Sequence, residues 1–151
     1  MLWLESNQRR QMAWRYLVGP GFSVRLLDKK DQQLKGSITL TRENARYRSD
    51  TFSDSTYSGQ TNIPLWRGTL RDAGHHAISK GQVRLRYEGW LQPALNDLQN
   101  WRFHSQAALQ AKMWKQLSFQ ASLQCNRESV VVQGVEYSRL MALFGLSIGN
   151  N

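Results

Sequence analysis

Apolar and polar residues alternate with a period of two along most of this chain. In the run from Lys115 to Cys125, every second residue from Leu117 onward is apolar, and the residues between are Ser or Gln. Successive side chains of a β-strand point to opposite faces, so such a run has one apolar face and one polar face. Helical spacing fits the chain less well than this period. The pattern therefore predicts an all-β protein.

The alternation predicts eight strands with turns between them. The second crosses a Gly19-Pro20-Gly21 kink, and the fourth has the least regular phase. Short connections at 28–32, 79–81 and 113–115 alternate with longer ones, as in outer-membrane barrels. We expect one domain over residues 1–151: an antiparallel up-and-down meander that closes into a β-barrel of about eight strands, or forms part of a larger one, with both termini at the short-turn end. The strands are expected at about residues 2–8, 13–27, 33–48, 65–77, 82–91, 100–112, 115–125 and 135–148, with longer connections at 49–64, 92–99 and 126–134.

Two kinds of β-barrel present such strands. An outer-membrane barrel has lipid against its apolar rows and a polar interior, whereas a soluble up-and-down barrel encloses the apolar rows around a small apolar ligand. The mean hydropathy of −0.57 does not separate them, because alternation averages each strand towards zero. The chain lacks the roughly 20 consecutive apolar residues of a transmembrane helix, so a helical membrane protein is ruled out.

The chain is strongly basic, with 20 Lys and Arg against 11 Asp and Glu. This excess favours anionic lipid, lipopolysaccharide phosphates or nucleic acid as partners, or is simple solvated charge. Guanidinium groups bind phosphate bidentately, so arginines near the long-loop end are the candidate lipid contacts. Nucleic acid is not expected, because the aromatic residues share the phase of the aliphatic ones and would be covered. The candidate anionic-lipid contacts are Arg9, Arg10, Arg42, Arg46 and Arg48.

Aromatic residues near strand ends suit a membrane-interface girdle, although soluble barrels also use tryptophan in their cores. The girdle candidates are Trp66, Trp90, Trp101, Trp114 and Tyr137.

Charged residues on the polar phase of the fifth and sixth strands form a candidate interior cluster. If the 92–99 connection pairs these strands symmetrically, Glu88 lies opposite Arg102 and Arg86 opposite His104. Because an eight-stranded barrel is just wide enough for side chains, the cluster would be a polar plug. The alternative is a solvated outer face. The cluster comprises Arg84, Arg86, Glu88, Arg102 and His104.

No catalytic motif is visible. His75 and His76 point to opposite faces of a strand and cannot share one metal ion, and the single Cys125 excludes an internal disulfide. There is no phosphate-binding Gly-rich loop, no Cys/His metal spacing and no nucleophile elbow. We therefore expect no enzyme activity, no cofactor and no metal.

Two stretches carry a family resemblance. The run Trp14–Asp28, and the run Trp101–Leu123 with Leu91-Gln-Pro93 before it, resemble a bacterial family described as salt-induced outer membrane proteins, a domain of unknown function. The resemblance covers most of the chain from about residue 12. It implies an outer-membrane β-barrel of Gram-negative bacteria with a structural or interaction role. The implied partners are outer-membrane lipid or lipopolysaccharide, and the barrel-assembly machinery during insertion. The resemblance transfers no catalytic residue.

The two ends of the chain differ from the family pattern. Family members carry a signal peptide, whereas the first residues here show no such pattern. If the protein is exported, this chain is a mature form or a shortened start. Family members also tend to end on an aromatic residue, whereas the last four residues here are Ile148-Gly-Asn-Asn151.

Overall fold

The computed structural model describes residues 2–79 and 81–148, which form one antiparallel sheet. The all-β meander expected from the alternation is confirmed. Across these residues no helix is long and apolar enough to cross a membrane. In chain order the elements are β1 (Leu2–Asn7), η1 (Gln8–Arg10), β2 (Met12–Val18), β3 (Gly21–Lys29), β4 (Gln32–Tyr47), η2 (Ser55–Tyr57), β5 (Asn62–Ile78), β6 (Val83–Ala94), β7 (Asp97–Lys112), β8 (Leu117–Glu128) and β9 (Ser138–Ile148).

The expected second strand is divided into β2 and β3 at Gly19-Pro20. Both pair with β4: β2 along residues 42–47 and β3 along residues 32–39. The backbone passes so close to β4 here that a Cβ on Gly19 would lie 2.0 Å from the Leu40 carbonyl oxygen. The Pro20 carbonyl accepts a hydrogen bond from the Leu40 N–H at 3.0 Å. Only glycine fits this approach, which explains why the kink falls at this dipeptide.

The connection expected at 92–99 is instead a tight turn over Leu95-Asn96, because β6 runs to Ala94 and pairs there with Asp97 of β7. The turn is held by β5. The Leu95 N–H donates to the Trp66 carbonyl at 2.7 Å, and the Asn96 Oδ1 accepts from the Trp66 N–H at 3.2 Å. The prediction of a long loop here was wrong, because these contacts with a third strand are not visible in the local sequence.

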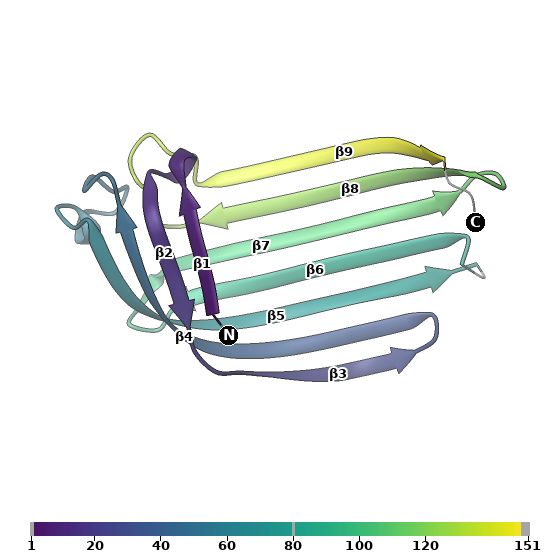
Figure 1. Ribbon diagram of the computed structural model, residues 1–151, viewed down its shortest axis with the longest axis horizontal. Helices are drawn as coiled ribbons and strands as arrows, with labels where there is room; N and C mark the ends of the chain where they lie inside the picture. The colour runs from purple at the N-terminus through teal and green to yellow at the C-terminus, as the bar shows by residue number, and fades with distance from the viewer. Residues whose placement is uncertain (1, 80, 149–151) are drawn as a thin grey trace.

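The long strands run side by side between two different ends (Figure 1). At the turn end lie the β3–β4, β5–β6 and β7–β8 connections, and at the loop end lie the connections 48–61, 95–96 and 129–137. In Figure 1, β1 and β2 cross in front of the long strands near the loop end. An ion pair between Arg10 of η1 and Glu128 of β8 joins the two sides of this curl. Within residues 2–79 and 81–148, β1 and β9 do not pair, so strand hydrogen bonds do not close the ring.

A small apolar core, the loop core, fills the loop end. Phe52 forms a bridge with Val132, which joins the 48–61 and 129–137 loops, and its ring meets the Tyr47 ring edge-on at 5.0 Å. Ile63 and Leu65, near the start of β5, are buried in this core. The loop core consists of Phe52, Tyr57, Ile63, Leu65, Ala94 and Val132.

Candidate functional site

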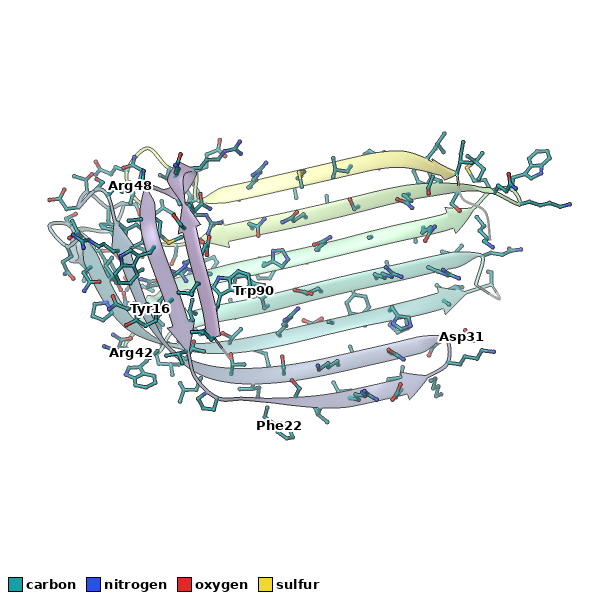
Figure 2. All side chains as sticks on the ribbon, in the orientation of Figure 1. Tyr16, Phe22, Asp31, Arg42, Arg48 and Trp90 are labelled. Carbon is teal, nitrogen blue, oxygen red and sulfur yellow. The ribbon has the colours of Figure 1, made fainter. Side chains whose placement is uncertain are left out.

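The convex face of the curled sheet is apolar and exposed. Strand register places apolar residues directly beside one another, as in the row Phe22, Ile38, Leu70, Leu91 and Phe103 across β3 to β7. In Figure 2, Phe22 extends away from the sheet. Phe144 and Ile148 of β9 are 74% and 80% exposed. Other exposed members of this apolar band are Leu4, Val18, Leu109, Leu123, Leu140 and Leu146.

Aromatic and cationic side chains border the apolar band at its loop-end margin. The Arg42 guanidinium lies over the Trp66 ring at 5.5 Å, and the Arg127 guanidinium lies over the Trp101 ring at 5.6 Å. Arg46 pairs across strands with Trp14. We call these residues the Arg–Trp belt: Trp14, Arg42, Arg46, Trp66, Trp101 and Arg127. At the turn end, Met113 and Trp114 are exposed in the β7–β8 connection.

The concave face carries a buried group of charges, which we call the ion cluster: Glu43, Arg67 and Arg102. The Arg102 Nη1 and Nη2 donate to the two Glu43 carboxylate oxygens at 2.7 Å each, a bidentate pair. The Arg67 Nε donates to Glu43 Oε2 at 2.7 Å. Both Glu43 and Arg67 are essentially unexposed. One carboxylate therefore holds two arginines from β5 and β7 against β4.

Neutral acceptors and further ion pairs extend the ion cluster. The other nitrogens of Arg67 donate to the Asn100 Oδ1 at 2.8 Å and to the Asn100 and Gln92 carbonyls. The Arg102 Nε lies 3.9 Å from Glu128, which also binds Arg10. These contacts connect β4, β5, β7, β8 and η1 across the concave side. Together with the loop core, they fill the loop end of the curl.

Tyr57 connects the 48–61 loop to β7. Its hydroxyl donates to the Asp97 carboxylate at 2.5 Å. Burial, followed by the hydrogen bond to Asp97, raises the pKa of the Tyr57 phenol to about 12. The neutral phenol is the form that this contact stabilises.

The five residues of the predicted interior cluster share the concave face but do not form one cluster. Arg102 belongs to the ion cluster, and His104 binds the Asn126 Oδ1 at 2.7 Å. Glu88 pairs with Arg71, whereas Arg84 and Arg86 lie nearer the turn end.

The pairing expected within this cluster was wrong. Glu88 lies opposite Gln106 and Arg86 opposite Ala108, four residues further along β7 than expected. His104 lies opposite Trp90, and Arg102 lies opposite Gln92. The cause is an irregularity beside the 95–96 turn: Ala94 pairs with Asp97, whereas Pro93 pairs with Trp101, so three additional residues of β7 move the register beyond this point.

The five surface arginines also separate. Arg42 and Arg46 lie in the Arg–Trp belt, whereas Arg10 faces inward and pairs with Glu128. Arg9 lies in η1, and the Arg48 backbone N–H donates to the Gln11 carbonyl at 2.7 Å.

Of the predicted aromatic girdle, Trp90 is misplaced. Its ring stacks on His104 at 5.5 Å on the concave face, on the side that β1 and β2 cover (Figure 2).

Sequence reasoning missed Glu43, Arg67 and Arg127. The irregular phase of the fourth predicted strand was the available signal for Arg67. Ile63 and Leu65 point inward to the loop core, whereas Leu70 points outward, so the apolar phase of β5 changes at Arg67. Arg67 therefore lies at the boundary between the loop core and the polar interior, where the apolar residues of β5 change from the inward to the outward face.

The described residues contain no group of three or more His, Cys, Asp or Glu side chains able to hold a metal ion. Cys125 is a free, half-buried thiol. The ion cluster presents no unpaired carboxylate or imidazole, so its arrangement suits holding strands together rather than moving protons.

The chain was compared with known families, curated proteins and solved structures. No curated protein and no solved structure matches it. The sequence profile of one family, described as "Protein of unknown function, DUF481", matches residues 3–149. Members of this family are commonly described as salt-induced outer membrane proteins. The family resemblance read from the two sequence stretches is thereby confirmed. Because the match extends over nearly the whole chain, this protein belongs to the DUF481 family, a family of unknown function.

Proposed function

We propose that this chain is an integral outer-membrane protein of a Gram-negative bacterium, with a structural or interaction role and no enzyme activity. Its partners would be outer-membrane lipid or lipopolysaccharide, and the barrel-assembly machinery during insertion. The common description of the family supports this proposal. The observation that supports the proposal most directly is the distribution of apolar and charged side chains between the two faces of the curl.

That distribution is the reverse of a water-soluble barrel. Leu, Phe and Ile cover the convex face, whereas the concave face buries Glu43, Arg67 and Arg102. A soluble barrel that binds an apolar ligand would enclose its apolar rows instead. Here Leu123 is 50% exposed on the convex side. Exposed apolar areas of this extent indicate a surface that meets lipid or another apolar partner.

The dimensions of the apolar band suit a bilayer. Between Trp101 and Lys112, β7 advances 11 residues, which corresponds to about 37 Å along the strand at about 3.4 Å per residue. A tilt of about 40° reduces this to about 29 Å, close to the hydrocarbon thickness of about 30 Å. The Arg–Trp belt and Trp114 would then lie at the two interfaces, where aromatic rings are favoured.

A pair of neighbouring residues on β9 provides the test. Phe144 points outward, and its neighbour Leu143 points to the concave face, paired with Ser122. An arginine on the lipid face near the middle of a bilayer costs about 2–4 kcal/mol, whereas one facing the interior costs less. We expect Phe144→Arg to reduce strongly the amount of protein that detergent extracts from the outer membrane. Leu143→Arg should leave this amount close to that of the wild type. The proposal fails if the wild-type chain is soluble without detergent, or if Leu143→Arg is the more damaging change.

We also propose that the Arg–Trp belt contacts the phosphates of lipopolysaccharide. Arg42, Arg46 and Arg127 lie on the convex face at the loop-end margin, where they could contact headgroup phosphates. Guanidinium groups bind phosphate bidentately, and their stacking on tryptophan holds them in place. Arg10 is left out, because it is engaged with Glu128.

Titration of lipopolysaccharide into the protein in neutral detergent, followed by tryptophan fluorescence, tests these contacts. The triple variant R42Q/R46Q/R127Q should bind at least about tenfold more weakly, a loss of about 1.4 kcal/mol or more. The double variant R84Q/R86Q changes charge on the concave face and should leave this binding unchanged. Equal losses in the two variants would contradict a specific belt site.

A further inference from the structure

The turn-end half of the concave face is hollow and open. Two adjoining depressions of about 660 and 590 Å³ lie there, and both are lined by His75 and Arg86. Ala73, Ala77 and Ala108 occupy concave positions beside them, so the space is not filled by side chains. We call this region the vestibule. The ion cluster and loop core fill the opposite end of the curl, so a solute would enter from the turn end.

The charges of the vestibule are unbalanced. It carries five Lys and Arg residues against three acids, Asp28, Asp31 and Glu88, an excess of two positive charges. Two of the acids already have partners: Arg25 binds Asp28 at 2.9 Å and Arg71 binds Glu88 at 2.8 Å. Within residues 2–79 and 81–148, the remaining basic groups have neither a hydrogen-bond nor an ion-pair partner. These are the side chains of Lys30, Lys35, His75, Arg84 and Arg86.

The strand register brings three of these groups together. Arg84 and Arg86 are two residues apart on one strand, so their side chains leave the same face about 7 Å apart. His75 lies directly opposite Arg86, at a cross-strand spacing of about 5 Å between Cβ atoms. Lys35 lies one row further along, opposite Ala73. Long side chains at these positions can converge on one ligand in the space above Ala73 and Ala77.

We propose that the vestibule binds a small multivalent oxyanion, with Arg84 and Arg86 as the principal contacts and His75 and Lys35 beside them. Two adjacent guanidinium groups offer paired N–H donors that match phosphate or carboxylate oxygens. A singly charged anion would leave part of the excess charge unbalanced, whereas a ligand with two or more negative charges would balance it. The proposal concerns the concave face alone and holds whether or not the convex face lies in lipid.

Isothermal titration calorimetry on the purified full chain in neutral detergent tests this inference. Inorganic tripolyphosphate and citrate are titrated separately, so that the tighter ligand identifies phosphate or carboxylate as the preferred group. Binding should weaken as salt is raised, because the contacts are ionic. The double variant R84Q/R86Q should bind about tenfold more weakly or worse, since both bidentate contacts are lost. Both side chains are exposed, so the variant should fold normally, which circular dichroism checks.

The matched control is R9Q/R48Q, which removes the same charge from exposed positions at the loop end, away from the vestibule. It should retain the affinity of the wild type within about twofold, about 0.4 kcal/mol. Absence of binding to both probes would overturn the inference, and so would equal losses in the two double variants. If the protein proves soluble without detergent, the same titration in plain buffer still tests the vestibule, so the two proposals can fail separately.

Discussion

Replacing Glu43 by glutamine tests whether the ion cluster holds the loop end together. The change keeps the shape of the side chain and removes its charge. The guanidinium groups of Arg67 and Arg102, which donate hydrogen bonds to Glu43 at 2.7 Å, would then lack their shared counter-ion. Arg102 retains Glu128 at 3.9 Å, but Arg67 retains only the neutral acceptors of Asn100 and Gln92. Arg67 is therefore the group left buried without an opposite charge.

The magnitude follows from that burial. Arg67 is 0% exposed, so water cannot replace the lost carboxylate. Breaking a buried ion pair by removing one partner costs about 3–5 kcal/mol. Because proteins are stable by only about 5–15 kcal/mol, Glu43→Gln should shift the unfolding transition to much lower denaturant. Urea unfolding in neutral detergent, followed by tryptophan fluorescence and circular dichroism, measures the change.

Two further variants identify the cause. Glu88→Gln breaks the Arg71 pair, whose side chains are 50% and 37% exposed, and should cost less than about 1 kcal/mol. Replacing all of Glu43, Arg67 and Arg102 by methionine removes the charges together and should recover most of the stability lost in Glu43→Gln. The reasoning is refuted if Glu43→Gln is no more destabilising than Glu88→Gln.

Three other changes test the loop end and the kink. Gly19→Ala places a Cβ 2.0 Å from the Leu40 carbonyl oxygen and should cost about 1–3 kcal/mol in the same urea assay; an unchanged midpoint would contradict the close approach. Phe52→Ala empties the centre of the loop core and should cost about 3–5 kcal/mol, with earlier proteolysis of the 48–61 loop as a second readout. In an alkaline absorbance titration, Tyr57 should ionise at a pKa of about 12, and Tyr57→Phe should remove that step. Because the folded pKa is raised, the stability from its contact with Asp97 is complete below about pH 10 and is lost as pH rises towards 12; loss below pH 10 would be inconsistent with this assignment.

The ion cluster and the vestibule divide the concave face between two roles. Near the loop end the charges are paired and buried, which stabilises the curl. Near the turn end Arg84 and Arg86 are exposed and have no side-chain partner among residues 2–79 and 81–148, which leaves them available to a ligand. The same residue types thus serve structure at one end and, in our proposal, recognition at the other.

Much of the fold was readable from the sequence, because the two-residue period of a strand is local. The segments around 33–48 and 100–112 correspond closely to β4 and β7. The separation into an apolar and a polar face also follows from that period, since each residue's side is set by its immediate neighbours. The same reasoning placed Arg102 and His104 correctly on one face.

Only the tertiary structure decided which residues meet across that face. Glu43 and Arg102 are 59 positions apart, and their contact depends on the register of four strands, β4 to β7, and on the curl of the sheet. The predicted register between β6 and β7 was wrong by four residues, because β7 carries three additional residues between the pairs Ala94–Asp97 and Pro93–Trp101. Alternation gives the side on which a residue lies but not its partner. The partner is set by hydrogen bonds between distant segments, which no local pattern records.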